Sequence, residues 1–325
     1  MIITRTPFRI SFAGGGTDLQ DYYHVEPGAV VSTAINKYVY IIVNKRFDSS
    51  IRVSYSRTEI VRNVDELQHP IVRETLKLVG IREGIEIVSI ADIPAATGLG
   101  SSSSFTVGLL NALYAYKGIL KSAEELAKKA CHIEINTLGE PIGKQDQFAA
   151  AYGGLRYFQF NSDESVFTEP ILYTQQRKRE LSRNLLLFYT GDTREARSIL
   201  QEQKANTRQS EKAALLKNMH DLAFNLRVHL NNGSSPDILG DFLHQGWLLK
   251  KQLANGVSNK KIDEYYQKAL SAGASGGKIA GAGGGGFMLL YCPKEKQSQV
   301  SKVLKCLTPM EFSLEPEGSK IIYII

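Results

Sequence analysis

The sequence is poor in cysteine, and its three cysteines form no metal or redox motif. Cys131, Cys292 and Cys306 contain no CxxC pair, which argues against a zinc site or a redox centre. Their odd number, without a secretory signal, indicates a reducing compartment, and we expect a cytoplasmic protein. Apolar runs of the ~18 residues that a membrane span needs are also missing, so we expect no membrane partner.

The common nucleotide-binding motifs are missing as well. A Walker loop places Gly, four residues and then Gly-Lys-Ser/Thr, but here Gly277-Lys278 is followed by Ile279, and position 272 is alanine. A dinucleotide-binding turn has the form G-x-G-x-x-G, and the segment from Gly98 to Ser103 lacks its last glycine. The sequence therefore disfavours both of these nucleotide sites.

The composition is that of a globular protein, and the moderate positive charge narrows the class of ligand. The 325 residues are 43% hydrophobic and 22% charged, which is enough for two domains with substantial cores. A net charge of +6 favours anionic ligands, either phosphorylated metabolites or nucleic acid. The basic residues are spread along the chain, with the densest run at 177–179, so we expect no nucleic-acid partner.

Strands and helices are grouped along the chain instead of alternating strictly. The first ninety residues are mostly strand-like. One helix is predicted to begin within 101–104, and another at Ser122, whose spacing to Glu125 predicts a capping box. Grouping of this kind predicts an α+β fold.

The second half opens on a predicted strand at 185–189 and continues into a long helical stretch at about 197–232. Residues from about 161 to 184 are polar and charged, and we expect them to form a connection. We therefore place an N-terminal domain at 1–180 and a C-terminal domain at 181–325.

The segment from Pro94 to Ser104 is the most distinctive motif. It follows a predicted strand and precedes an apolar helix, and its Gly98 and Gly100 let the backbone turn tightly and approach a ligand. The helix N-terminus then offers free N–H groups to an anion, and four serines add hydroxyls, one of which could ligate Mg²⁺. The alternative is a Gly/Ser linker or a plain helix cap, which the closely flanking strand and helix disfavour.

A second glycine-rich segment, residues 273–286, directly precedes a predicted buried strand at 287–291. So much glycine is usually interpreted as a disordered linker. Lys278, Ile279 and several alanines punctuate the segment, however, and structured elements bound it. We therefore expect its backbone to approach a ligand or the first glycine loop closely.

Three charged residues are candidates for catalysis, although each has an ordinary alternative role. Arg9 alternates with apolar residues on a strand that runs into three glycines and then Asp18. Taken alone, these are a surface arginine and a turn aspartate. Asp146 stands where a helix is predicted to start, which alone is typical of a helix N-cap or first-turn acid.

These segments coincide in order and separation with the motifs of one family. Residues 6–18, 94–104 and 278–286 resemble motifs one, two and three of the GHMP kinases, which are named for galactokinase, homoserine kinase, mevalonate kinase and phosphomevalonate kinase. The resemblance spans almost the whole chain, and the second motif is highly specific. It implies a two-domain α+β fold, with an N-terminal domain like a domain of ribosomal protein S5 and a ferredoxin-like C-terminal domain. ATP and the acceptor would meet between them.

By this resemblance the chain is a kinase that uses ATP and Mg²⁺. Asp146 matches the catalytic aspartate, and Arg9 matches the arginine that pairs with it. Ser102 and Glu134 match the metal ligands. The residues implied to surround the ATP phosphates are Pro94, Gly98, Leu99, Gly100, Ser101, Ser102, Ser103 and Ser104.

The acceptor site is implied to include Asp18, which matches the acid that binds sugar hydroxyls. Lys144 and Arg194 are candidate ligands for an acceptor phosphate, with solvated surface charge as the alternative role. The remaining residues that we expect at the acceptor are Gly14, Gly15, Gly16, Thr17, Gly283 and Gly284.

The first motif also narrows the acceptor itself. Galactokinases carry Gly-Glu-His-Thr-Asp where this chain has three glycines, Thr17 and Asp18, so galactose is disfavoured and a larger acceptor fits. This form of the motif is most similar to the heptose 7-phosphate kinase subgroup. That similarity implies transfer to the anomeric hydroxyl of D-glycero-D-manno-heptose 7-phosphate, giving a 1,7-bisphosphate for nucleotide-activated heptose. A fucokinase-like sugar-1-kinase and a non-catalytic sugar–ATP sensor are the alternatives, and a homodimer is left open.

Overall fold

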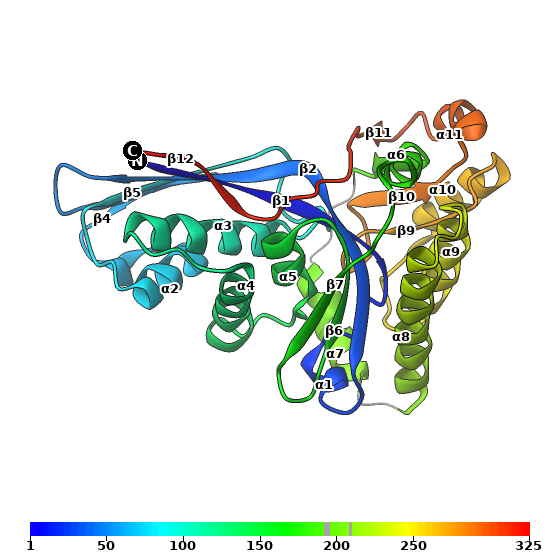
Figure 1. Ribbon diagram of the computed structural model, residues 1–325, viewed down its shortest axis with the longest axis horizontal. Coiled ribbons are helices and arrows are strands. Elements are labelled where there is room, and N and C mark those ends of the chain that lie inside the picture. Colours follow the sequence, from blue (N-terminus) through cyan, green and yellow to red (C-terminus); the bar gives the residue numbers. More distant parts are fainter. Residues whose placement is uncertain (192–195, 208–209) are drawn as a thin grey trace.

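Two sheets, each with its own helices, organise the chain in the computed structural model (Figure 1), which describes residues 1–191, 196–207 and 210–325. The predicted α+β character is confirmed, because strands pair mostly with antiparallel neighbours and helices are gathered on particular faces. The two sheets meet through β1 and the helices of the second part, and this junction positions the site described below.

The larger sheet is antiparallel apart from one parallel pair, β3 with β5. Its strands follow the order β12 (Lys320–Ile324), β1 (Ile2–Ala13), β2 (Gly28–Lys45), β5 (Ile85–Ala91), β3 (Ile51–Ser54) and β4 (Thr58–Val61). The first half of β2 leaves this path and pairs with β6 (Leu155–Phe160), which in turn pairs with β7 (Val166–Pro170). A strand as long as β2 can therefore serve two groups of partners.

Helices cover one face of this sheet (Figure 1). The central one, α3 (Ser101–Tyr116), is buried along most of its length and contacts β1 and β2. α2 (Pro70–Val79) ends at Gly80, whose φ of +74° suits a residue without a Cβ. The predicted capping box of Ser122 and Glu125 opens α4 (Ala123–Cys131). The remaining short helices of this part are α1 (Gln20–Tyr23), the 3₁₀ turn Val64–Glu66 and α5 (Gln145–Tyr152).

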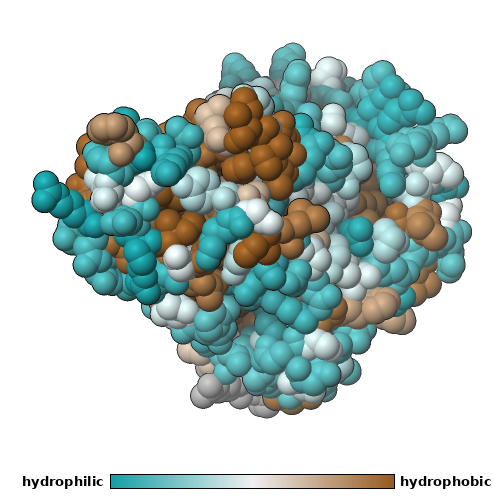
Figure 2. All heavy atoms as spheres, turned by 60° about the vertical axis from the view of Figure 1, so that its left-hand side comes forward, coloured by the Kyte–Doolittle hydropathy of each residue, from teal (hydrophilic) through white to brown (hydrophobic). Residues whose placement is uncertain are grey.

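The opposite face of the sheet is less covered, and several large apolar side chains are exposed along β4, β5 and β12. They include Ile60, Ile90, Ile322 and Ile324. Figure 2 shows hydrophobic side chains gathered in groups on the side turned forward, between larger hydrophilic areas. Within the described ranges, no helix combines the length and the apolar character that crossing a membrane requires.

The smaller sheet has a strand buried throughout at its centre. Its order is β11 (Thr308–Pro309), β8 (Leu185–Tyr189), β10 (Phe287–Tyr291) and β9 (Gly276–Ile279), all antiparallel. β10 is buried on both faces because helices pack around it. The helices of this part are α6 (Gln175–Arg183), α7 (Ala196–Asn206), α8 (Ser210–Asn231), α9 (Ile238–Lys250), α10 (Lys260–Ser271), the 3₁₀ turn Lys294–Lys296 and α11 (Gln297–Val303).

One expectation about the middle of the chain was wrong. Residues 161–184 do not form a plain connection, because β7 pairs with β6 and Thr174 caps α6 by accepting from the Arg177 N–H. The helical stretch expected at about 197–232 corresponds to α7 and α8, and residues 208–209 between them lie outside the described ranges.

The end of the chain returns to the first sheet. β12 pairs with β1, and the Met1 ammonium donates to the Ile325 carbonyl oxygen at 3.0 Å. Both termini accordingly lie together in Figure 1. The division into 1–180 and 181–325 stays a prediction, and the sheet pairing shows that the last strand lies with the N-terminal part.

Candidate active site

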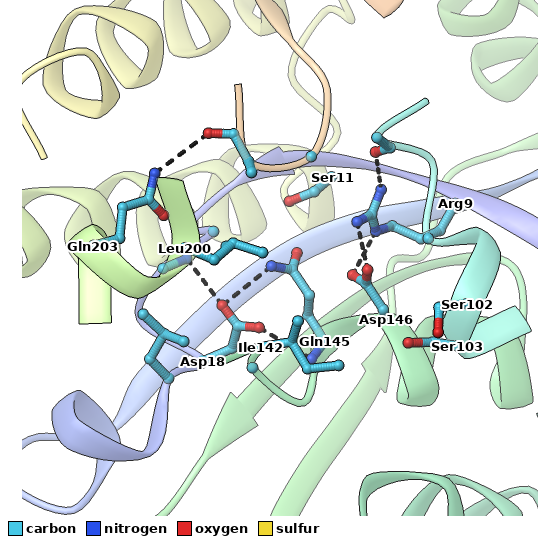
Figure 3. A pocket seen from close by; sticks show the side chains of 18 of the residues that line it. Arg9, Ser11, Asp18, Ser102, Ser103, Ile142, Gln145, Asp146, Leu200 and Gln203 are labelled. Atoms are coloured by element: carbon cyan, nitrogen blue, oxygen red, sulfur yellow. Dashed lines mark hydrogen bonds and ion pairs between the residues drawn. The ribbon is translucent and has the colours of Figure 1, made fainter. Parts of the chain in front are cut away.

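A cavity lies where the two parts meet (Figure 3). Its walls come from β1 and the loop that follows it, the first glycine loop, the start of α5, α7, the end of α9 and the second glycine loop. The structure brings these sequence-predicted residues together around it: Arg9, Gly15, Gly16, Asp18, Gly98, Gly100, Ser101, Ser102, Ser103 and Asp146.

Arg9 and Asp146 form the expected pair. The Arg9 Nε and Nη2 atoms donate to the two carboxylate oxygens of Asp146, each at 2.6 Å. Its Nη1 atom donates to the Gly98 carbonyl oxygen at 2.7 Å. Arg9 is 4% exposed, whereas the Asp146 side chain is 23% exposed, so this two-point contact is buried on the arginine side and open to the cavity on the carboxylate side. Figure 3 shows the Asp146 carboxylate turned toward Arg9 at the edge of the cavity.

The two glycine-rich loops touch each other, as the sequence predicted. A Cβ on Gly98 would lie 2.6 Å from the Ala280 carbonyl oxygen, and one on Gly281 would lie 2.5 Å from the Gly98 Cα atom. Gly98 also has a φ of +86°. Any side chain at these positions would force the loops apart, so the glycines permit this close approach.

Glu134 is buried behind the start of α3. It lies on a π-helical turn, His132–Thr137, that continues α4. Its carboxylate accepts from Ser102 Oγ at 2.6 Å, Ser103 Oγ at 2.9 Å and Gln147 Nε2 at 2.7 Å. Burial raises the pKa of Glu134, and these three hydrogen bonds work in the opposite direction. These donors favour the charged form, whereas burial favours the neutral form and leaves the pKa raised.

The donor set around Glu134 fits Mg²⁺. Ser102 and Glu134 place a hydroxyl and a carboxylate oxygen side by side, and Mg²⁺ prefers oxygen ligands and retains several waters. In the described part of the chain, no three His, Cys, Asp or Glu residues are arranged as a complete metal cage. Coordination by two protein ligands is consistent with the way Mg²⁺ is held at phosphate-binding sites.

Asp18 is a buried acid on the opposite side of the cavity. Its Oδ1 atom accepts from the Gly16 backbone N–H at 2.9 Å and from Gln145 Nε2 at 3.1 Å. Its Oδ2 atom accepts from the Gln145 backbone N–H at 3.2 Å. Burial raises the pKa of Asp18, with the nearby Asp146 charge acting in the same direction. A Cβ on Gly143 would lie 2.0 Å from Asp18 Oδ2, so this residue must be small.

Other predicted acceptor residues shape the first loop without lining the cavity. The Thr17 Oγ1 atom lies 2.8 and 2.9 Å from the Gly14 and Ala29 carbonyl oxygens, which compete for its single proton, and it accepts from the Ala29 backbone N–H at 2.9 Å. Gly14 packs so tightly that a Cβ would lie 1.8 Å from the Ala29 carbonyl oxygen. Both residues thereby fix the turn that presents Asp18.

Several predicted residues are not brought to the cavity. The Lys144 ammonium pairs with Glu164 and lies 4.5 Å from the centroid of the Tyr23 ring. Gly283 and Gly284 pack on Val257. In the first glycine loop, Pro94 is exposed, Leu99 is buried in the core, and Ser104 donates to the Pro7 carbonyl oxygen. Arg194 lies outside the described residues.

The cavity is also lined by residues that were assigned no role from the sequence. They include Lys250, Lys278, Gln145, Gln203 and Leu200. Lys278 lies inside the third motif, and Gln145 is the neighbour of Asp146 in the sequence. Their positions therefore could have indicated that they line the cavity. Lys250 ends an ordinary amphipathic helix, and no local pattern distinguishes it from the lysine that follows it.

Comparison with known proteins identifies one family along the chain. Residues 60–154 match the family described as GHMP kinases N terminal domain, and residues 213–307 match GHMP kinases C terminal. The D-glycero-alpha-D-manno-heptose 7-phosphate kinase of Campylobacter jejuni is 29% identical, with 98% of each chain covered. The bifunctional fucokinase/GDP-fucose pyrophosphorylase of Arabidopsis thaliana is 26% identical over 92% of this chain and 30% of its own length.

Solved structures share the fold over its whole extent. A D-glycero-D-manno-heptose 1-phosphate kinase from Bacteroides thetaiotaomicron aligns with a TM-score of 0.81 over 100% of both chains, at 22% sequence identity. At that identity, the likeness concerns the architecture rather than the substrate.

Proposed function

Because the chain belongs to the GHMP kinases and is an ATP-dependent kinase, we propose that it phosphorylates the anomeric hydroxyl of D-glycero-D-manno-heptose 7-phosphate. The product would be the 1,7-bisphosphate, for synthesis of nucleotide-activated heptose. The observation that carries the proposal is the Asp146 carboxylate, which Arg9 holds at the cavity between the first glycine loop and Asp18. The similarity to a heptose 7-phosphate kinase over nearly the full length supports this acceptor.

Asp146 is the base in the proposed reaction. It accepts the proton of the C1 hydroxyl while that oxygen forms a bond to the γ-phosphorus, and the bond from the γ-phosphorus to the bridging oxygen breaks to release ADP. The two contacts from Arg9 fix the carboxylate and leave lone pairs free on both oxygens. Positioning of this kind, together with electrostatic stabilisation, supplies most of the rate in phosphoryl transfer.

The start of α3 receives the triphosphate in this proposal. The backbone N–H groups at 101–103 are at a helix N-terminus, where free donors and the helix dipole favour an anion. Ser102 and Glu134 would hold Mg²⁺, which neutralises negative charge on the phosphates when it is bound. The Ser102 and Ser103 hydroxyls donate to Glu134 in the structure. In this proposal they rotate toward the phosphate oxygens while the backbone stays in place.

Asp18 orients the sugar. Its carboxylate is fixed by backbone donors and by Gln145, so its remaining acceptor positions are available to sugar hydroxyls in the cavity. Gly15 and Gly16 line the cavity beside it and, having no side chain, take up none of its space. This arrangement fits an acceptor larger than a hexose.

An acceptor screen tests the proposal. ATP consumption is measured with D-glycero-D-manno-heptose 7-phosphate, the same heptose without phosphate, L-fucose and mevalonate, and phosphorus NMR locates the new phosphate. We expect the highest kcat/KM with heptose 7-phosphate and a product phosphorylated at C1. A preference for L-fucose would favour the fucokinase-like alternative, and a new phosphate at any other carbon would refute the assignment of the reacting hydroxyl.

A further inference from the structure

Two buried lysines face the cavity from the second part of the molecule. Lys250 ends α9, and Lys278 lies on β9, where it pairs in register with Leu289 of β10. They are 5% and 7% exposed, and both line the same cavity as Asp18 and Asp146. Lysine is among the residues that are almost never fully buried unless they are paired.

Neither lysine has an acidic partner in the described ranges. The Lys250 ammonium donates to the Gly281 carbonyl oxygen, and the Lys278 ammonium donates to the Ser11 carbonyl oxygen at 2.9 Å. An ammonium carries three N–H groups, so one backbone acceptor leaves most of its hydrogen-bonding capacity unused. By contrast, Lys144 and Lys251, which neighbour the site in sequence or in space, each pair with a carboxylate.

The surroundings increase the cost of keeping these two charges. Burial lowers the pKa of Lys250 to about 8, and the Arg9 charge acts in the same direction. Burial also lowers the pKa of Lys278 well below its usual value, and the Lys250 charge adds to this effect. Asp18 opposes both shifts, and Asp146 opposes that of Lys250. A purely structural role would be served at lower cost by an apolar residue at either position.

We propose that Lys250 and Lys278 together bind a terminal phosphate group, as its dianion, in the cavity. An anion between the two ammonium groups would accept their unused N–H donors and offset their mutual repulsion. This inference rests on the proposed function, because it identifies the groups that would hold a phosphate of the substrates at that same site. One of the two phosphates that could bind there is that of the acceptor, for which the sequence had suggested Lys144 and Arg194.

Two phosphates of the proposed reaction have this chemistry. The carbonyl oxygen that holds Lys250 belongs to Gly281, which touches Gly98 of the nucleotide loop. The carbonyl oxygen that holds Lys278 belongs to Ser11, whose hydroxyl would lie 3.6 Å from a Cβ on Gly15 in the acceptor loop. The subsite therefore spans the two loops, and its ligand is either the acceptor's own phosphate or the γ-phosphate of ATP.

The substitutions Lys250→Met and Lys278→Met distinguish the two candidate ligands, the phosphate of the acceptor and the γ-phosphate of ATP. If the acceptor's phosphate is bound, each substitution lowers the preference in kcat/KM for heptose 7-phosphate over the unphosphorylated heptose by roughly 10- to 100-fold. If the γ-phosphate is bound, each substitution lowers the affinity ratio of a non-hydrolysable ATP analogue to ADP by roughly the same factor. Either shift supports the subsite. Changes below about threefold in both ratios for both variants would overturn it.

Lys251→Met is the matched control, because Lys251 follows Lys250 on the same helix end but pairs with Asp263. Thermal unfolding of each variant shows that the fold is retained. Inorganic phosphate, titrated calorimetrically into the nucleotide-free protein, gives an independent readout. We expect measurable binding to the unsubstituted protein and to Lys251→Met, and an affinity lower by roughly tenfold or more in Lys250→Met and Lys278→Met. Absence of phosphate binding by the unsubstituted protein would contradict the subsite even if the heptose is not the acceptor.

Discussion

The two walls of the cavity bury their charges in opposite ways. On the wall built by the N-terminal part, Glu134 accepts three hydrogen bonds and Asp146 accepts two from Arg9. On the wall built by the C-terminal part, Lys250 and Lys278 each have one backbone acceptor. A buried charge with complete hydrogen bonding is preorganised, whereas one with spare donors is stable only at a cost that a ligand can remove.

This contrast suggests that the two walls have different roles, one in catalysis and the other in binding a phosphate. The N-terminal wall resembles preorganised catalytic machinery, because the carboxylates of Glu134 and Asp146 already have their hydrogen-bond donors in place. The C-terminal wall supplies charge without a fixed partner, which suits a group that arrives with each substrate and leaves with each product. Substitutions should therefore damage the two walls in different ways.

The largest effect is expected for Asp146→Asn on the N-terminal wall. The amide keeps one oxygen for Arg9 but cannot accept the proton of the hydroxyl, so kcat should fall about 10²–10⁴-fold. Nucleotide affinity should stay within about threefold, because Asp146 is not among the groups proposed to hold the triphosphate. Steady-state kinetics and nucleotide titration measure the two quantities, and Asp163→Asn, at an exposed turn, is the control. A decrease in kcat of less than about tenfold would remove Asp146 from its role as the base.

Glu134→Leu tests whether the hydrogen bonding on this wall matters for folding. Leucine keeps much of the volume but leaves the Ser103 hydroxyl and the Gln147 amide buried without their acceptor. The free energy of unfolding should fall by about 2–4 kcal/mol, as measured by urea denaturation. Glu124→Leu removes only an exposed partner of Lys128, and its effect should stay below about 1 kcal/mol. Equal losses in both variants would contradict the contrast between buried and exposed carboxylates.

Lys250→Met should shift stability in the opposite direction. Its folded-state pKa of about 8 lies below the usual 10.5, so between these pH values the unfolded chain binds more protons than the folded chain. The contribution of this site to the free energy of unfolding therefore rises with pH across that window. At pH 7 the methionine variant should be more stable by roughly 1–3 kcal/mol, and the gap should narrow toward pH 10. Urea denaturation at both pH values measures it, and a pH-independent gap would contradict the stated cause.

The sequence predicted the N-terminal wall far better than the C-terminal one, for a physical reason. The residue types of the first glycine loop already indicate an anion site, whereas the pairing of Arg9 with Asp146 was expected only from the family resemblance of their motifs. The fold class followed from the grouping of strands and helices. The role of Lys250, in contrast, depends on how α9 packs against the second glycine loop, and no local pattern records that contact. The return of β12 to β1 is likewise a long-range pairing.

Lys144→Met should have the smallest effect on activity among these variants. It thereby tests whether Lys250 and Lys278 differ from a lysine that is paired with a carboxylate. Lys144 and Asp146 are two residues apart at the start of α5, and successive helical side chains turn by about 100°, so the two point to nearly opposite sides. The Lys144 ammonium accordingly meets Glu164 and the Tyr23 ring instead of the cavity. Glu164 is half-exposed and also contacts His24, so loss of Lys144 should change KM for the acceptor by less than about threefold. A rise in acceptor KM as large as that of Lys278→Met would show that Lys144 turns toward the phosphate when the substrate is bound.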